Sequence, residues 1–186
     1  MRKLIFQQWL SLDGYAADKN GTVTFIESSA KYSDEQQLAF LDSVDTFLLG
    51  ANTYKLFYEF WPTATNEAEV IADKLNSMNK IVFSSSLTEA PWGKWPVAQV
   101  IKGSASEAVR VLKMQEGKDI VLWGSISVSQ ELMKNNLIDE YHLRIVPKAL
   151  GSGRKFFEGE VPLNFELYEL KSDEAGVVVL KYRRKG

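Results

Sequence analysis

Three short turns of small and polar residues are the first places in this sequence where chemistry is expected. They are Gly50-Ala51-Asn52-Thr53, Ser84-Ser85-Ser86 and Gly124-Ser125-Ile126-Ser127, and each follows an apolar run typical of a β-strand. In an open α/β sheet, ligands bind outside the carboxyl ends of the strands, where helix N-termini offer free N–H groups to phosphate. A single such turn would mean little, because tight turns need small residues anyway. The three together predict a phosphate-bearing cofactor.

The residue types that are missing narrow the chemistry further. There is no G-x-G-x-x-G motif and no G-x-x-x-x-G-K-[ST] motif. The 186 residues include no Cys and a single histidine, which excludes disulfides, cysteine nucleophiles and thiolate or multi-histidine metal sites. That histidine, His142, follows Glu140 in an alternating strand pattern and is expected to be a packed or interface imidazole. If the protein is an enzyme, a bound cofactor is therefore expected to supply its chemistry.

Charge and hydropathy indicate the kind of partner. The chain carries 22 Lys and Arg against 24 Asp and Glu, a net charge of −2, and it has no basic run, which argues against nucleic acids and anionic membranes. The apolar start is interrupted by Gln7, Gln8 and Ser11 and is too short for a signal or membrane-spanning segment. We expect one domain, residues 1–186, in a cytoplasmic setting with a small-molecule substrate.

The elements that must hold the three turns are strands alternating with helices, the pattern of an α/β fold. Short runs that are apolar on both faces suit a mixed, mostly parallel sheet covered by helices on both sides, and the last two alternating runs predict a closing antiparallel hairpin. Strands are expected at 3–10, 46–49, 80–84, 98–101, 120–123, 140–146, 164–170 and 177–183.

Helix starts are marked by serines followed three residues later by Glu or Gln. These capping boxes are Ser33…Gln36, Ser104…Glu107 and Ser127…Gln130, and they predict helices to about Ser43, over 107–115 and to about Asn135. A fourth helix is expected at about 67–78 from its apolar stripe. The Pro- and Trp-bearing piece 89–96 is expected to be a surface loop.

The joint order of several motifs resembles the dihydrofolate reductase-like fold, and within it the reductase domain of riboflavin biosynthesis and its stand-alone bacterial relatives. The resemblance covers about residues 2–183. Its pieces are Ser11-Leu12-Asp13-Gly14, 49–54 against the pattern L-G-R-x-T-Y, 80–87, Trp123-Gly124-Ser125 against a Gly-Gly turn, 137–147, 150–153 and Phe156-Phe157. The resemblance implies a three-layer α/β fold, a homodimer, and hydride transfer from NADPH to a pterin-like or pyrimidine-like compound such as dihydrofolate or 5-amino-6-(5-phosphoribosylamino)uracil.

The same resemblance implies which residues bind the cofactor. Those on the pyrophosphate and adenosine side would be Gly50, Ala51, Asn52, Thr53, Ser84, Ser85, Ser86 and Lys102. Those cradling the pyrophosphate would be Gly124, Ser125, Ile126 and Ser127, and those beside the nicotinamide would be Trp9, Leu10 and Ala16.

Two positions depart from the family pattern. Ala51 stands where the family usually has Arg, whose guanidinium can pair bidentately with a 2′-phosphate, so the preference for NADPH over NADH is expected to weaken unless Lys102 and the serine run compensate. Ser125 replaces the second Gly of a turn that approaches the phosphate closely, where a Cβ is expected to crowd it. These departures keep open an alternative, a nucleotide- or ligand-binding module of the same fold without turnover.

Asp34 is the candidate catalytic acid. It lies sixteen residues before Gly50, the spacing at which dihydrofolate reductases carry the carboxylate that assists protonation of the substrate ring. An acid in the first turn of a helix is also favoured by the helix dipole alone, so a purely structural role stays open.

Aromatic residues are the candidates for substrate contact. Phe57 and Trp61 could wall a substrate pocket or fill the core, and Phe25, with Trp9, is an alternative ring-stacking candidate. The segment Gly151-Ser152-Gly153-Arg154-Lys155 looks like a phosphate loop, and the family resemblance implies a place near the active site, but it is expected to form a flexible turn with solvated charges.

Overall fold

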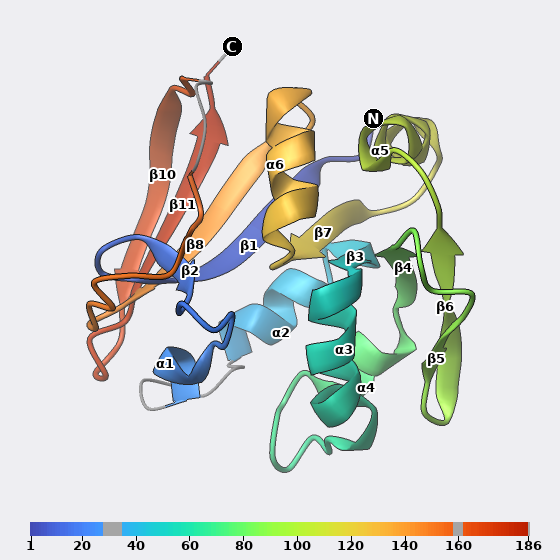
Figure 1. The fold of residues 1–186 in the computed structure, drawn as a ribbon, viewed down its shortest axis with the longest axis horizontal. Helices are drawn as coiled ribbons and strands as arrows, with labels where there is room; N and C mark the ends of the chain where they lie inside the picture. Colours follow the sequence, from blue (N-terminus) through green and yellow to red (C-terminus); the bar gives the residue numbers. More distant parts are fainter. Residues whose placement is uncertain (28–34, 158–161, 186) are drawn as a thin grey trace.

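A nine-stranded sheet runs through the computed structural model, which describes residues 1–27, 35–157 and 162–185 (Figure 1). Its strand order is β10-β11-β8-β1-β7-β3-β4-β6-β5. The strands are β1 (Leu4–Ser11), β3 (Val44–Gly50), β4 (Asn79–Phe83), β5 (Ala90–Trp92), β6 (Trp95–Ile101), β7 (Asp119–Trp123), β8 (Glu140–Val146), β10 (Phe165–Ser172) and β11 (Val178–Arg184).

The centre of this sheet is parallel and its ends are antiparallel. Strands β8, β1, β7, β3, β4 and β6 pair in parallel, while β11 joins β8 and β10 in antiparallel fashion and β5 is antiparallel to β6. The predicted mixed, mostly parallel sheet with a C-terminal hairpin is thereby confirmed. The carboxyl ends of the central strands meet at one edge, where the three turns follow them.

Helices cover both faces of the sheet. They are α1 (Thr24–Glu27), α2 (Glu35–Leu41), α3 (Ala51–Phe60), the 3₁₀ turn η1 (Trp61–Thr63), α4 (Ala72–Ser77), α5 (Ala105–Met114) and α6 (Ile126–Lys134). Successive side chains of a strand point to opposite faces, so β1 sends Leu4 and Phe6 into the core under α5 and α6, and Ile5 into the core under α2, α3 and α4 (Figure 1). Among the described residues, no helix is long and apolar enough to cross a membrane.

The structure confirms some of the predicted helix starts and corrects others. Ser104 caps α5, because its hydroxyl accepts the Glu107 backbone N–H at 3.3 Å, as the capping box predicts. The box at Ser127 is wrong: α6 begins at Ile126, and the residue before it is Ser125 in the left-handed conformation. Ser33 lies outside the described residues, and the helix expected at 67–78 is limited to Ala72–Ser77. Helix α3 was not expected from the sequence.

The piece 89–96 is not the expected surface loop. Ala90–Trp92 forms β5, and the Trp92 side chain is completely buried. Its indole N–H donates to Asn76 Oδ1 at 2.6 Å. The turn at Gly93 folds β5 back onto β6, so the large apolar area of Trp92 is removed from water despite the flanking Pro and Gly.

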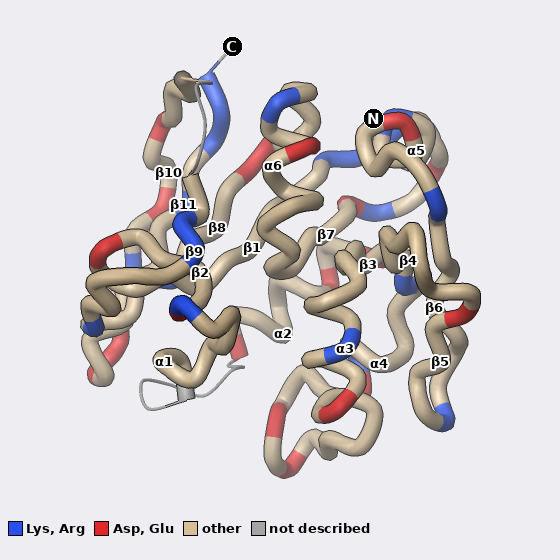
Figure 2. Tube along the Cα trace, in the orientation of Figure 1, with Lys and Arg blue, Asp and Glu red and all other residues tan. Residues whose placement is uncertain are grey.

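A second, two-stranded sheet holds the loop after β1. Here β2 (Tyr15–Ala17) pairs antiparallel with β9 (Arg154–Lys155). Asp13 fastens the same two segments, because its carboxylate accepts the backbone N–H groups of Leu150 at 3.1 Å and Gly151 at 2.7 Å. The Ser11 hydroxyl also donates to Asp13, and these bonds lower the pKa of Asp13 to about 2. The pairing brings β9, with its basic residues, beside β2 (Figure 2).

Candidate functional site

A cavity of about 1050 Å³ opens at the carboxyl ends of β1, β3, β4 and β7. It exceeds the ~300–1,000 Å³ of ordinary small-molecule pockets. All three predicted turns line it: 50–53, 84–86 and 124–127. Segments far apart in the sequence therefore converge on one space, which is large enough for a dinucleotide together with a second small molecule.

Most of the residues that the sequence singled out line this cavity. They are Trp9, Ala16, Gly50, Ala51, Asn52, Thr53, Phe57, Trp61, Ser84, Ser85, Ser86, Gly124, Ser125, Ile126 and Ser127. The cavity lining does not include Leu10, Phe25 or the exposed Lys102. Leu10 is buried in the core under α6, and Phe25 is buried in a small cluster against which Trp9 packs. Asp34 lies outside the described residues.

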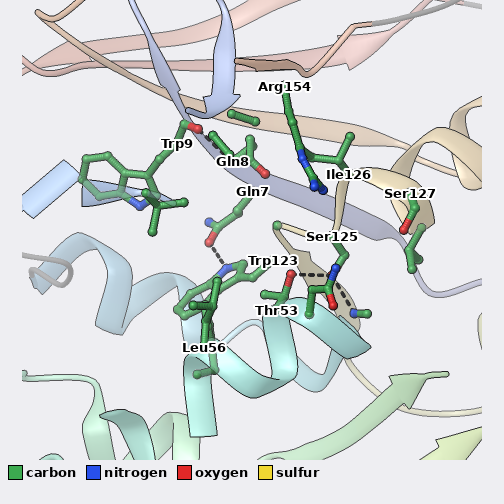
Figure 3. Close-up of a pocket in the computed structure, with 18 of the residues that line it drawn as sticks. Gln7, Gln8, Trp9, Thr53, Leu56, Trp123, Ser125, Ile126, Ser127 and Arg154 are labelled. Carbon is green, nitrogen blue, oxygen red and sulfur yellow. Dashed lines mark hydrogen bonds between the residues drawn. The ribbon is translucent and has the colours of Figure 1, made fainter. Parts of the chain in front are cut away.

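Ser125 joins two of the three turns. Its hydroxyl accepts the Gly50 backbone N–H at 2.6 Å and donates to Thr53 Oγ1 at 2.9 Å (Figure 3). The φ angle of Ser125 is +64°, a left-handed conformation that favours glycine. A Cβ on Gly50 would lie only 3.0 Å from the Ser125 hydroxyl, so position 50 has no room for a side chain. The start of α3 is thus fixed against the start of α6.

Gln7 organises the part of the cavity beneath Trp123. Its side-chain oxygen accepts the indole N–H of Trp123 and the amide N–H of Gln37, the latter at 2.8 Å. Its amide nitrogen lies 3.4 Å from His142 Nδ1. Both the oxygen and the nitrogen of the Gln7 side chain are therefore engaged by side chains from three other elements.

An aromatic wall and an arginine complete this compartment. The rings of Phe57 and Trp61 pack with that of Trp123, with centroids 6.0 and 6.4 Å away. On the opposite side, the Arg144 guanidinium lies 5.2 Å from the centre of the Trp9 ring, and Arg144 also donates to Gln37 at 3.2 Å. Flat apolar walls with amides between them suit a planar heterocycle that carries polar edges.

His142 is a packed imidazole, as the sequence predicts. It is 5% exposed, its Nε2 lies 2.8 Å from the Tyr168 hydroxyl, and that hydroxyl donates to Glu140 at 2.8 Å. Because the hydroxyl hydrogen goes to Glu140, Nε2 carries the imidazole hydrogen and Nδ1 accepts from Gln7. Burial lowers the pKa of His142 below its usual 6.5, although Glu140 opposes the shift. Hydrogen bonds from His142, Lys3 and Tyr168 hold the pKa of Glu140 far below its usual value.

We predict that His142 stays neutral to a pH below 6.5. Since the unfolded chain then binds a proton that the folded chain does not, the free energy of unfolding should fall as the pH is lowered from about 7 to 5. The only histidine gives one set of imidazole NMR signals, whose midpoint measures the pKa directly. In a His142→Gln variant the free energy of unfolding should change less between pH 7 and 5. Glu140 does not replace the effect, because its lowered pKa makes the stability depend on pH mainly below its ordinary pKa of 4.5. A midpoint at or above 6.5 would contradict the prediction.

The charges around the cavity are predominantly positive. Of the described residues, four basic ones line it, Arg144, Arg154, Lys155 and Lys181, against the single acid Glu59. Figure 3 shows Arg154 reaching down between Gln8 and Ile126, toward the start of α6. Within the described part of the chain, the Arg154 guanidinium has neither an ion-pair nor a hydrogen-bond partner. A free guanidinium beside a helix N-terminus is an arrangement that favours an anionic ligand.

The sequence analysis missed several of these residues. Arg154 and Lys155 are exposed, as the sequence predicts, and their pairing with β2 also places them at the cavity. Gln7 and Gln8 were interpreted only as interruptions of an apolar run. Over the ranges that the structure describes, no three His, Cys, Asp or Glu residues come together in a group able to hold a metal ion.

Comparison with known proteins identifies the family of this chain and a relative of similar length. The family model of the RibD C-terminal domain matches residues 2–179. The chain is 30% identical to the uncharacterized protein YyaP of Bacillus subtilis (strain 168) over 190 residues, which cover 100% of this chain and 96% of that protein.

Two solved structures show the same fold. A provisionally named riboflavin biosynthesis protein from Shewanella sp. PV-4 superposes with a TM-score of 0.79 at 25% identity, covering 99% of both chains. Dihydrofolate reductase from Enterococcus faecalis, in a complex with NADP(H), superposes with a TM-score of 0.60 at 14% identity, covering 99% of this chain and 97% of the reductase. The dihydrofolate reductase-like fold is confirmed, and the chain belongs to the RibD C-terminal domain family.

Proposed function

We propose that the protein is an NAD(P)H-dependent reductase that transfers a hydride to a small pterin-like or pyrimidine-like substrate. The observation that carries this proposal is one cavity that joins three small-residue turns, and an arginine without a partner among the described residues, to an aromatic, amide-lined compartment. The first part suits a phosphate-bearing dinucleotide, and the second suits a planar heterocycle. Membership of the RibD C-terminal domain family supports the reaction class.

The residues present fit a dinucleotide. Helices α3 and α6 both begin at the cavity, and the first N–H groups of a helix have no partner within it. Arg154 adds a positive charge near the start of α6 (Figure 3). When bound, the nicotinamide would supply the hydride, while the protein would supply binding, orientation and electrostatics. Ser125 already takes the Gly50 N–H, so the phosphate groups would rely on the later N–H groups of α3, on the first N–H groups of α6 and on Arg154.

The compartment around Gln7 is proposed to receive the substrate. Phe57 and Trp61 would contact its ring, and Gln37 and Arg144 would face its polar edge. Asp34 is proposed to assist protonation of the ring. That assignment rests on the family resemblance and on its spacing from Gly50.

Separate titrations with NADPH and NADH test the proposal. Saturable binding of at least one is expected, and the ratio of the two affinities measures what Ala51 does to the preference for the 2′-phosphate. Oxidation of the bound cofactor is then followed with dihydrofolate and with ribityl- or ribosylaminopyrimidines, and an unchanged rate in Asp34→Asn would remove Asp34 from the mechanism. No saturable binding of either dinucleotide at millimolar concentration would overturn the proposal.

A binding module without turnover is the second candidate function. Ala51 and Ser125 favour it, since the first lacks the expected guanidinium and the second occupies the Gly50 N–H. Dinucleotide binding without oxidation by any substrate in the panel would support this alternative. A homodimer and a cytoplasmic setting remain expectations and belong to the same proposal.

A further inference from the structure

We propose that Gln8 reads the nicotinamide riboside half of the bound dinucleotide, by accepting a hydrogen bond from an N–H or O–H group on it. This inference rests on the proposed function and names a specificity-determining residue for it. Gln8 lies on β1 next to Gln7, and because successive residues of a strand point to opposite faces, its side chain lies on the α6 side of the sheet.

The side-chain oxygen of Gln8 is the basis of this inference. Gln8 is only 8% exposed, it lines the cavity, and its side-chain oxygen is buried without a hydrogen-bond partner among the described residues. A buried acceptor that has lost water and gained no donor is unfavourable, and such groups in native structures call for an explanation. A donor on a ligand in the cavity supplies one.

The orientation of this amide is fixed. Its nitrogen donates to the backbone oxygen of Trp9 at 2.8 Å. Flipping the amide would place two acceptors against each other, so the oxygen must be the atom that is left without a partner. Gln7 differs from Gln8 in this respect, because the oxygen of Gln7 accepts from Trp123 and Gln37 and its nitrogen lies against His142.

The surroundings select the kind of ligand group that would satisfy this oxygen. A Cβ built on Gly124 would lie 3.9 Å from Gln8 Oε1, so the oxygen lies beside the turn that opens α6. Phosphate oxygens suit the neighbouring Arg154 and the α6 N–H groups, but they would repel a carbonyl oxygen (Figure 3). The group at Gln8 must therefore be a donor that adjoins the phosphates.

Two groups of the nicotinamide riboside half meet this requirement, the carboxamide N–H₂ and the ribose hydroxyls. The family resemblance implies that the adenosine half lies at the turns 50–53 and 84–86, which follow β3 and β4, and β7 with the α6 turn separates these strands from β1. Gln8, one residue before Trp9 on β1, lies on the nicotinamide side of that division.

The test is calorimetric binding to the wild type and to Gln8→Met, which keeps the length of the side chain and removes the acceptor. We expect Gln8→Met to weaken NADP⁺ binding about fivefold to tenfold and to leave 2′,5′-ADP, which lacks the nicotinamide half, unchanged. The matched control is Gln99→Met on the exposed part of β6, which is expected to alter neither. The 3-acetylpyridine analogue of NADP⁺ lacks the carboxamide N–H₂ and therefore distinguishes this donor from the ribose hydroxyls. If Gln8 binds the carboxamide, the wild type should bind the analogue more weakly than NADP⁺, and Gln8→Met should bind the two equally.

The possible failures are distinguishable. If the wild type binds NADP⁺ and Gln8→Met binds it equally well, the role of Gln8 is overturned and the proposed function stands. Equal loss of NADP⁺ and 2′,5′-ADP would also overturn it, since Gln8 would then act on the fold or on the adenosine half. Failure of the wild type to bind any dinucleotide would overturn both proposals. Should Gln8→Met not fold, the smaller Gln8→Thr variant replaces it, with the same expected split between NADP⁺ and 2′,5′-ADP.

Discussion

Replacing Arg154 with glutamine is expected to weaken NADPH binding by roughly 10- to 30-fold. A charge-assisted hydrogen bond to phosphate contributes about 1.5–3 kcal/mol, and the lower part of that range applies because Arg154 is partly screened by solvent. The Arg154 guanidinium has no competing partner among the described residues, so no contact within that part of the chain needs to be broken before it binds an anion. Glutamine keeps a polar side chain on β9, and the backbone pairing with Ala17 is preserved.

The measurement is the dissociation constant of NADPH at low and at physiological ionic strength. Wild-type affinity should fall as salt is added, and the dependence should be shallower in Arg154→Gln because one ionic contact is missing. Arg110→Gln is the matched control, since Arg110 lies on α5, bonds to Asn135 and does not line the cavity. Equal losses in the two variants would show that net charge, rather than a contact with Arg154, sets the affinity.

Replacing Trp92 with alanine should lower the free energy of unfolding by about 3–5 kcal/mol, the range for removing a large aromatic side chain from a core. Trp92 is 0% exposed, and its loss would leave Asn76 Oδ1 without its donor. The Lys80 ammonium lies 5.1 Å from the Trp92 ring, and burial lowers the pKa of Lys80 to about 8. Water entering the vacated space would solvate that ammonium and offset a small part of the loss.

Urea unfolding of Trp92→Ala and of Val97→Ala measures this effect. Val97 lies on the neighbouring β6 and is 67% exposed, so its truncation should change stability by less than about 0.5 kcal/mol. A loss below about 1 kcal/mol in Trp92→Ala would mean that the β5–β6 hairpin is not part of the cooperative core. Neither variant should change NADPH affinity, because neither side chain lines the cavity.

The strands were predictable because their signal is local. In β8 apolar residues recur along 140–146, and the observed strand has those bounds. Helix α5 was also predicted, because Ser104 and Glu107 supply a capping box that acts within one turn. Helix α3 lacks such a signal: Gly50 gives no side-chain cap, and 51–60 is rich in aromatic residues that are not strong helix formers.

The site was most predictable where it consists of turns, although Trp9, Ala16, Phe57 and Trp61 also line the cavity as expected. The turns at 50–53, 84–86 and 124–127 are visible as small residues at strand ends, and the structure brings them together. Gln7 and Gln8 carried no such signal, because a buried glutamine is tolerated only through partners that the fold brings from distant segments, such as Trp123 and Gln37. The sequence predicts the solvated charge of Arg154 but not the pairing with β2 that brings it to the cavity, since a two-residue strand is too short for any pattern.

The position of β1 in the sheet has a consequence for how the chain is made. Strand β1 is paired with β7 at 119–123 and with β8 at 140–146, and both of these strands are synthesised much later than β1. Until residue 146 has emerged, the apolar side chains of Leu4, Ile5 and Phe6 lack the strand that pairs along the other side of β1. The centre of the sheet, and with it the floor of the cavity, is therefore completed only after β8 has been synthesised, and until then the apolar residues of β1 are the kind of exposed segment that is prone to aggregation.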